Sequence, residues 1–292
     1  MFQSCLICTD FTDGLHRFID CVPNLAQCGL NKIVFFHSVQ LWEEGEVPRV
    51  DEEKIQQARQ RFEKALDNVP DSVEVVIEVV SGKPLDTIPR VLKKHPVDVI
   101  MTGTPIKSLL EEKFFGSTST GLAKLTSQPL NIIRPELITT YTLEELDLRC
   151  RHLWRYLLIP YNNSQSARYL IDEIKKYAQN RPENSLKQCM LMSVVDDCGR
   201  KSVLAEQRVK DSKNQLASVK EELEALNIEV NTLVKVGDPL QEITTAALDY
   251  DISAIAIATD YRNSLVQWTV RSFANDLMRS SWFPILLFSP KK

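Results

Sequence analysis

Residues 101–120 read MTGTPIKSLLEEKFFGSTST. The apolar residues 97–101 predict a strand that ends just before Gly103, and Gly116-Ser117-Thr118 predicts the start of a helix. Glycine lets the backbone approach a phosphate closely, and the first N–H groups of a helix have no partner within it. The stretch is therefore compatible with an anion-binding loop, or with a capped helix that follows a surface loop.

The size and charge of the chain restrict the classes of protein that it can represent. With 292 residues it is long enough for two ordinary domains, and its net charge of −4 argues against binding to nucleic acid. The N-terminal residues lack the basic and apolar regions of a signal peptide, and the apolar runs are too short to cross a bilayer. We therefore expect a cytoplasmic protein that binds neither nucleic acid nor membrane.

The sequence shows no catalytic or metal-binding motif. Its four histidines are not at metal-ligand spacing, and neither a nucleophile elbow nor a Walker A motif is present. Cys5 and Cys8 form a C-x-x-C pattern, but they fall within a predicted strand, where a buried structural role is favoured over a redox role. We predict no catalytic residue, no metal site and no enzyme activity beyond incidental ATP hydrolysis.

An internal repeat divides the chain. Gly82-Lys83-Pro84-Leu85 recurs as Gly237-Asp238-Pro239-Leu240, a shift of 155 residues (237 − 82). Pro129 and Pro284 show the same shift, as do Pro135 and Pro290. A constant offset predicts two copies of one domain. We assign the first to 1–135 and the second to 155–292, joined by a linker at 136–154 in which Thr142 begins a capping box.

Each copy alternates short apolar segments with segments of helical periodicity. In the first copy the predicted strands are 4–9, 32–39, 73–80, 97–101 and 130–133, and the second copy repeats this order. Alternation of this kind predicts an α/β fold with a doubly wound, five-stranded parallel sheet in each domain. Ligands of such sheets bind beyond the carboxyl ends of the strands, where the strand order reverses. Asp10, Val39 and Gly103 all lie at predicted strand ends.

The order of elements and the glycine spacing resemble the universal stress protein family in its tandem two-domain form, over nearly the whole chain. The resemblance implies an adenine nucleotide α-hydrolase-like fold and, in many members, ATP binding through the motif G-x2-G-x9-G-[ST]. Here Gly103, Gly116 and Ser117 match that motif, and Ile106 stands at its second glycine.

The resemblance also implies a role for individual residues of the first copy. Asp10 would contact the ribose, and the backbone of Val39 would meet the adenine. Gly103 would lie beside the ribose and phosphates. The resemblance assigns the phosphate contacts to the N–H and hydroxyl donors of the following residues: Gly116, Ser117 and Thr118.

Both copies depart from the family motif. Ile106 adds a side chain where the family leaves room, Pro105 removes an N–H donor, and two glutamates of the same loop would repel phosphate. In the second copy Ala258, Tyr261 and Arg271 replace the three glycines. We therefore expect the second domain to be degenerate and structural.

Taken with the sequence observations, the resemblance implies a cytoplasmic stress-response or signalling module that binds ATP or another adenine nucleotide in domain 1 and acts on an unidentified protein partner. The alternative is a nucleotide-free structural or signalling scaffold in which both sites are degenerate. A third possibility is a pocket for another, more apolar ligand. The two copies are expected to form an intramolecular pseudo-dimer about a local two-fold axis, and the chain is a possible homo-oligomer.

Overall fold

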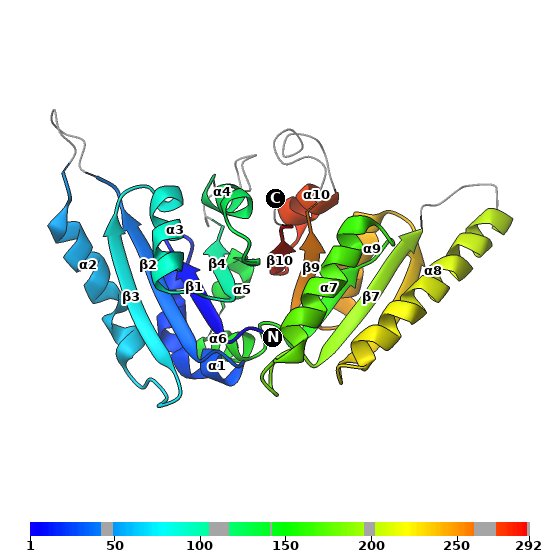
Figure 1. Cartoon of the computed structure of the whole chain (residues 1–292), viewed down its shortest axis with the longest axis horizontal. Coiled ribbons are helices and arrows are strands. Elements are labelled where there is room, and N and C mark those ends of the chain that lie inside the picture. The colour runs from blue at the N-terminus through cyan, green and yellow to red at the C-terminus, as the bar shows by residue number, and fades with distance from the viewer. Residues whose placement is uncertain (42–48, 105–116, 141, 196–201, 260–272, 291–292) are drawn as a thin grey trace. The chain divides into compact units, whose positions relative to one another are not determined.

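The computed structural model describes residues 1–41, 49–104, 117–140, 142–195, 202–259 and 273–290. The chain forms two compact units, Phe2–Arg151 and His152–Lys292, the second of which also includes Met1. In both units strands and helices alternate along the chain (Figure 1). The predicted α/β fold with a parallel sheet is confirmed.

The strands of the N-terminal unit lie in the order β3-β2-β1-β4-β5, and every pair between them is parallel (Figure 1). The chain moves from β1 outward to β3 and then returns to add β4 on the other side of β1. The strand order therefore reverses between β1 and β4. The strands are β1 (Ser4–Cys8), β2 (Lys32–Val39), β3 (Glu74–Ser81), β4 (Val99–Gly103) and β5 (Leu130–Ile133).

The helices of this unit pack against the sheet through apolar stripes. In α2 the buried side chains are Ile55, Ala58 and Phe62, at the spacing of one helix face. The helical elements are η1 (Leu15–Cys21), α1 (Val22–Gln27), α2 (Glu52–Glu63), η2 (Lys64–Leu66), α3 (Pro84–Lys94), α4 (Ser117–Leu125), α5 (Pro135–Ile138) and α6 (Leu143–Arg151).

The C-terminal unit repeats the arrangement, with the strand order β10-β9-β6-β7-β8. Its strands are β6 (Tyr156–Pro160), β7 (Gln188–Val195), β8 (Glu229–Val236), β9 (Ala254–Ala258) and β10 (Ile285–Phe288). Its helices are α7 (Gln165–Gln179), α8 (Ser202–Glu224), α9 (Pro239–Asp249) and α10 (Phe273–Ser280).

Most predicted elements lie within a few residues of the observed ones, and β4 is shifted by two residues from its predicted range. We predicted that this strand runs over 97–101, but it begins at Val99. The Asp98 carboxylate accepts hydrogen bonds from the N–H groups of Gln3 (2.8 Å) and Ser4 (3.0 Å). Asp98 thus fixes the start of β1 with its side chain, and its own N–H donates to the Ser4 carbonyl (3.1 Å), so the two segments are already paired at Asp98.

The linker helix is confirmed as α6, and it packs on α1 within the N-terminal unit. Thr142 Oγ1 accepts a hydrogen bond of 3.3 Å from the N–H of Glu145, which is the N-cap contact that the capping-box spacing predicted.

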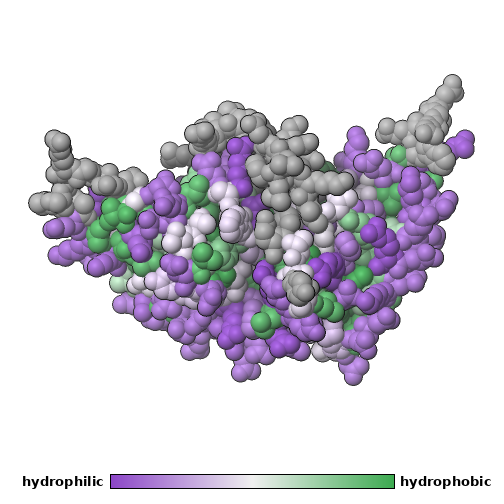
Figure 2. Space-filling model, turned by 180° about the vertical axis from the view of Figure 1, so that it is seen from behind, coloured by the Kyte–Doolittle hydropathy of each residue, from purple (hydrophilic) through white to green (hydrophobic). Residues whose placement is uncertain are grey.

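The surface is mainly hydrophilic on the face that Figure 2 shows, where hydrophobic residues form several separate patches. Single large apolar side chains, such as Trp282 and Leu248, are well exposed. Isolated exposures of this kind are normal for globular proteins, so they do not identify a docking surface. Within the residues that the structure describes, no helix is long and apolar enough to cross a membrane.

Candidate functional site

A pocket lies at the carboxyl ends of β1, β2 and β4 in the N-terminal unit. Cys8 at the end of β1 pairs with Thr102 of β4, so the pocket is at the point where the strand order reverses. The cavity has a volume of about 100 Å³. Its lining residues are Cys8, Thr9, Asp10, Asp13, Phe36, His37, Ser38, Pro84, Ile88, Thr102, Gly103, Thr118 and Ser119.

Three of the six predicted site residues meet at this pocket. Asp10 enters from the end of β1, Gly103 from the end of β4, and Thr118 from the first turn of α4. The first turn of a helix offers unpaired N–H groups and a partial positive charge. The structure thus brings together a carboxylate, a glycine and a helix N-terminus that are far apart in the sequence.

The other three predicted residues are placed differently. Val39 is not among the residues that line the pocket, although its neighbours His37 and Ser38 are. The Val39 carbonyl accepts a hydrogen bond from Gly82 N–H (2.9 Å). Gly116 lies outside the described residues. Ser117 is the first residue of α4, and only its backbone is described.

Asp10 is exposed and its carboxylate is held in a local turn. Oδ1 of Asp10 accepts hydrogen bonds from the N–H (2.8 Å) and the hydroxyl (2.7 Å) of Thr12. These contacts fix the direction of the side chain at the pocket rim. A fixed exposed carboxylate is suited to accept hydrogen bonds from the hydroxyl groups of a sugar.

Asp13 is the most consequential residue that the sequence did not single out. Its side chain is only 5 % exposed and packs directly on Gly103. A Cβ added to Gly103 would lie 2.6 Å from Asp13 Cβ, which no real structure tolerates without a shift. Gly103 is therefore required here for packing against Asp13, independently of any ligand.

The environment of the Asp13 carboxyl opposes its ionisation. Burial raises its pKa to about 6, and the nearby charge of Asp10 adds to that effect, while hydrogen bonds from the Thr9 hydroxyl (2.6 Å) and Leu15 N–H (3.0 Å) act in the opposite direction. The signal in the sequence was a second aspartate three residues after Asp10, but loop aspartates are usually solvated.

A ring cluster supports the pocket wall at β2. The His37 Nδ1–H donates to the Thr9 carbonyl (2.8 Å), which leaves Nε2 as the acceptor of the neutral ring. Burial lowers the pKa of His37, so the neutral form is favoured. Phe11, at φ 66°, lies 4.5 Å from the His37 ring, and the Arg61 guanidinium lies 3.8 Å from the Phe11 ring.

The helix side of the pocket is joined to the sheet by two buried hydroxyls. Ser119 Oγ donates to Thr102 Oγ1 at 3.0 Å, and both residues are almost fully buried. This bond fixes the first turn of α4 to the end of β4. The turn that would bind an anion is thereby held beside Gly103.

The C-x-x-C pattern is structural, as its position in a strand indicated. Cys5 and Cys8 both lie in β1 and are buried, and burial raises the pKa of each thiol. A thiol with a raised pKa is a poor nucleophile. Across the part of the chain that the structure describes, no group of three or more potential ligands is placed to hold a metal ion.

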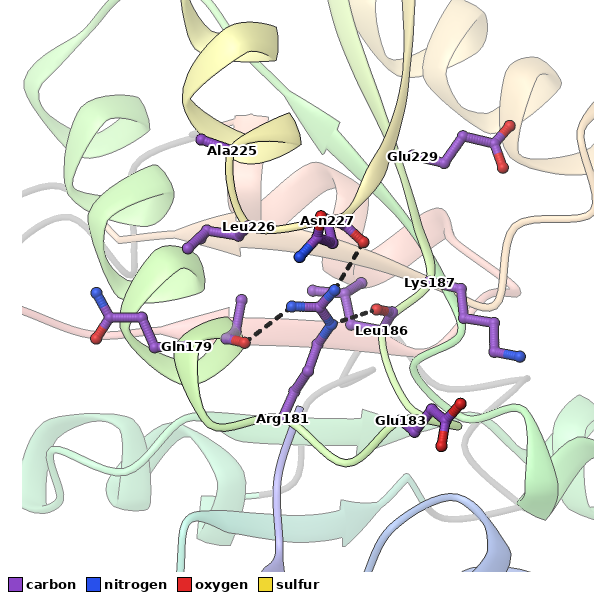
Figure 3. Close-up of a pocket in the computed structure, with 10 residues that line it drawn as sticks. Gln179, Arg181, Glu183, Leu186, Lys187, Ala225, Leu226, Asn227 and Glu229 are labelled. Carbon is purple, nitrogen blue, oxygen red and sulfur yellow. Dashed lines mark hydrogen bonds between the residues drawn. The ribbon is translucent and has the colours of Figure 1, made fainter.

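A larger pocket of about 650 Å³ lies in the C-terminal unit, at the amino ends of β7 and β8 (Figure 3). Arg181 fills its centre and donates to the carbonyls of Ala178 (3.0 Å), Leu186 (2.9 Å) and Asn227 (2.8 Å). Ala178 belongs to α7 and Asn227 follows α8, and carbonyls at helix C-termini attract cations. Arg181 therefore has a structural role and connects the C-terminal ends of α7 and α8.

Comparison with solved structures identifies the fold. A universal stress protein from Archaeoglobus fulgidus DSM 4304 matches over 98% of both chains, with a TM-score of 0.67 and 16% identity. A functionally unknown protein from Pseudomonas aeruginosa PAO1 matches over 99% of this chain and 93% of its own, with a TM-score of 0.62 and 12% identity.

A shorter match is a universal stress protein in complex with cAMP, at 17% identity and a TM-score of 0.32, covering 46% of this chain and 98% of its own. No curated protein sequence matches this chain significantly. The profile of the Universal stress protein family matches residues 1–134 and 154–289, one copy in each unit. The chain therefore belongs to the universal stress protein family, in its tandem two-domain form.

Proposed function

We propose that this chain is a stress-response or signalling module that binds one adenine nucleotide in the N-terminal unit, while the C-terminal unit is degenerate and structural. Nucleotide binding is typical of universal stress proteins, and the family is usually non-catalytic. The module would act through an unidentified protein partner rather than through chemistry of its own.

The observation that carries the proposal is the meeting of Asp10, Gly103 and the first turn of α4 at one pocket. Asp10 would accept hydrogen bonds from the ribose, and the backbone of Val39, directly after the lining residue Ser38, would meet the base. The N–H groups at the start of α4 would face the phosphates. The motif residues Gly116 and Ser117 complete this assignment in the sequence.

The effect of the nucleotide would be a population shift. A ligand held by Gly103 on one side and by the start of α4 on the other favours one conformation of the segment between them. That segment belongs to the loop 103–116, which includes Lys107 and Glu111 among its charged residues. Binding would thus change the surface that the protein presents to a partner.

Two features of the pocket would fit the alternative, a nucleotide-free scaffold. A cavity of about 100 Å³ is smaller than the roughly 300–1,000 Å³ of typical ligand sites. The buried Asp13 carboxyl also occupies the space beside Gly103. In this case the pocket would be part of the core of the domain, and no adenine compound would co-purify.

The decisive experiment is to denature the purified protein and to identify released small molecules by mass spectrometry. We expect an adenine nucleotide in an amount of about one per chain, and isothermal titration with ATP should give a measurable Kd. If no adenine nucleotide is released and titration with ATP gives no measurable Kd, the nucleotide-free scaffold is the better explanation.

A matched pair of variants tests the location. Gly116→Leu places a branched side chain in the motif and should abolish ATP binding. Arg271→Leu changes the equivalent position of the second copy (116 + 155 = 271) and should leave the Kd unchanged. Equal affinity of Gly116→Leu and the unmodified protein would exclude this site.

A further inference from the structure

The pocket of the N-terminal unit contains a buried carboxyl group where an anionic ligand would have to bind. Asp13 Oδ2 lies only 2.8 Å from the position that a Cβ on Gly103 would occupy. The two hydrogen bonds from Thr9 and Leu15 both go to the other oxygen, Oδ1. Oδ2 is therefore the oxygen turned toward Gly103, the residue at which the motif places ribose and phosphate.

The described lining offers little positive charge to balance this carboxyl. The titratable side chains that share the pocket with Asp13 are Asp10 and Cys8, on or directly after β1, and His37 on β2. His37 is favoured as the neutral ring, because burial lowers its pKa. The residues that α3, β4 and α4 contribute are uncharged: Pro84, Ile88, Thr102, Gly103, Thr118 and Ser119.

An ionised Asp13 would repel a phosphate placed beside Gly103, since two negative charges a few ångströms apart in a poorly hydrated site interact strongly. A protonated Asp13 removes that repulsion and offers an O–H donor. A nucleoside without phosphates carries no such charge, so the state of Asp13 matters much less for its binding.

We propose that binding of a phosphate-bearing nucleotide in this pocket takes up a proton at Asp13, so that affinity for the nucleotide increases as the pH falls from the neutral range into the mildly acidic range. The inference rests on the proposed nucleotide site and adds its regulation. The group that responds to pH is the buried Asp13 carboxyl, which hydrogen bonds from Thr9 and Leu15 hold against Gly103. The module would bind its ligand more tightly when the surroundings acidify.

The test compares ATP and adenosine at pH 5.5, 6.5 and 7.5 by isothermal titration, without divalent cations that could bridge Asp13 to a phosphate. We expect the Kd for ATP to rise about tenfold from pH 5.5 to 7.5, within the usual range of coupling between sites. The Kd for adenosine should change far less. The ATP phosphates titrate as well, so the comparison between protein variants decides the result.

Asp13→Asn keeps the size and the acceptor oxygen but removes the charge. It should bind ATP at pH 7.5 about as tightly as the unmodified protein does at pH 5.5, with a flatter pH profile. Asp86→Asn removes an equal charge from the exposed first turn of α3 and should keep the original profile. Asp13→Ser, which also lacks the carboxyl, provides the same comparison if Asp13→Asn fails to fold.

The outcomes separate the two proposals. If ATP binds to the unmodified protein and to Asp13→Asn with the same pH profile, the proton coupling is wrong and the nucleotide site stands. If neither protein binds ATP or adenosine at any of the three pH values, both the site and the coupling are wrong.

Discussion

At the scale of single residues, Asp13 and Gly103 show how a family motif can be present for more than one reason. The glycine matches the motif, and the structure shows that it also makes room for a buried aspartate. The sequence could predict Gly103, because it lies at a predicted strand end and keeps the family spacing to Gly116 and Ser117. It could not predict Asp13, because burial of a loop carboxyl depends on contacts between β1 and β4 that are distant in the chain.

The buried Asp13 predicts a pH-dependent stability in the absence of ligand. Its folded pKa of about 6 exceeds the ordinary 3.8, so its contribution to stability is present below pH 4 and is lost as the pH rises through 6. Asp13→Asn should therefore be more stable than the unmodified protein at pH 7.5, by about 1–3 kcal/mol. Urea unfolding at pH 4, 6 and 7.5 measures the difference. A gap that does not widen with pH would contradict the assignment.

The contact between Gly103 and Asp13 predicts the effect of a single methyl group. Gly103→Ala should destabilise the N-terminal unit by roughly 1–3 kcal/mol, because the new Cβ would meet Asp13 Cβ at 2.6 Å. Thermal melting measures the cost. In an Asp13→Gly background the same substitution should cost much less, since the opposing side chain is gone. Equal costs in both backgrounds would show that another contact limits the site.

Val39 lies at the end of β2, where the resemblance places the contact with adenine. The sequence predicted β2 over 32–39, which the structure confirms, and placed Val39 at the ligand. The resemblance assigns the adenine contact to the backbone of Val39, and the direction of a side chain does not test a backbone contact. Val39 is buried, and its neighbours His37 and Ser38 line the pocket, so the assignment stays a prediction.

At the scale of elements, the two copies of the G-x-P-L motif begin equivalent helices with different caps. Asp238 accepts a hydrogen bond from Gln241 N–H (2.9 Å) at the start of α9. Lys83 holds the same N-cap position in α3, with similar extended backbone angles, and makes no side-chain cap. The difference between the two caps is visible in the sequence as Lys83 against Asp238.

This difference predicts that α3 can be stabilised. Lys83→Ser should supply the missing acceptor, as Ser164 does for Ala167 N–H at the start of α7, and add about 0.5–1 kcal/mol to local stability. Hydrogen exchange of the α3 amides measures the gain. Lys83→Ala, which removes the lysine and adds no acceptor, is the control. The cap is not responsible if both variants change protection equally.

The pairing of α7 with α8 predicts a second pH effect, of opposite sign. Hydrogen bonds from Arg168 (2.6 Å to each oxygen) and from Lys175 (2.7 Å) outweigh burial and lower the pKa of Glu222 to about 2. Because this pKa is depressed, its stabilisation is present above pH 4.5 and is lost as the pH falls toward 2. Arg168 is partly exposed, so solvent screening reduces the effect to about 1–2 kcal/mol.

Glu222→Gln should therefore destabilise the C-terminal unit by that amount at pH 7 and by much less at pH 3. Guanidinium unfolding at the two pH values tests this, with Glu221→Gln, the exposed neighbour, as control. If the free energy of unfolding falls by the same amount at both pH values, the charge of Glu222 does not stabilise the unit through Arg168 and Lys175.

At the scale of the whole molecule, the duplication was the most informative feature of the sequence. A shift of 155 residues that holds for glycines and prolines predicted two domains of one fold, and the family profile matches each half separately. Runs of apolar residues predicted the strands, because parallel strands that are buried on both faces are continuously apolar. The intramolecular pseudo-dimer stays a prediction, since patterns within one domain do not determine how two domains pack.

The asymmetry between the two halves leads to a prediction for the intact chain. The N-terminal half has Gly103, Gly116 and Ser117 at the motif positions, whereas the C-terminal half has Ala258, Arg271 and Ser272. A phosphate loop without glycines cannot bring its backbone close to the ligand. Native mass spectrometry of the intact protein with excess ATP should therefore show one bound nucleotide per chain. A second nucleotide that binds with similar affinity would mean that the C-terminal half holds phosphate through side chains, and would contradict its structural role.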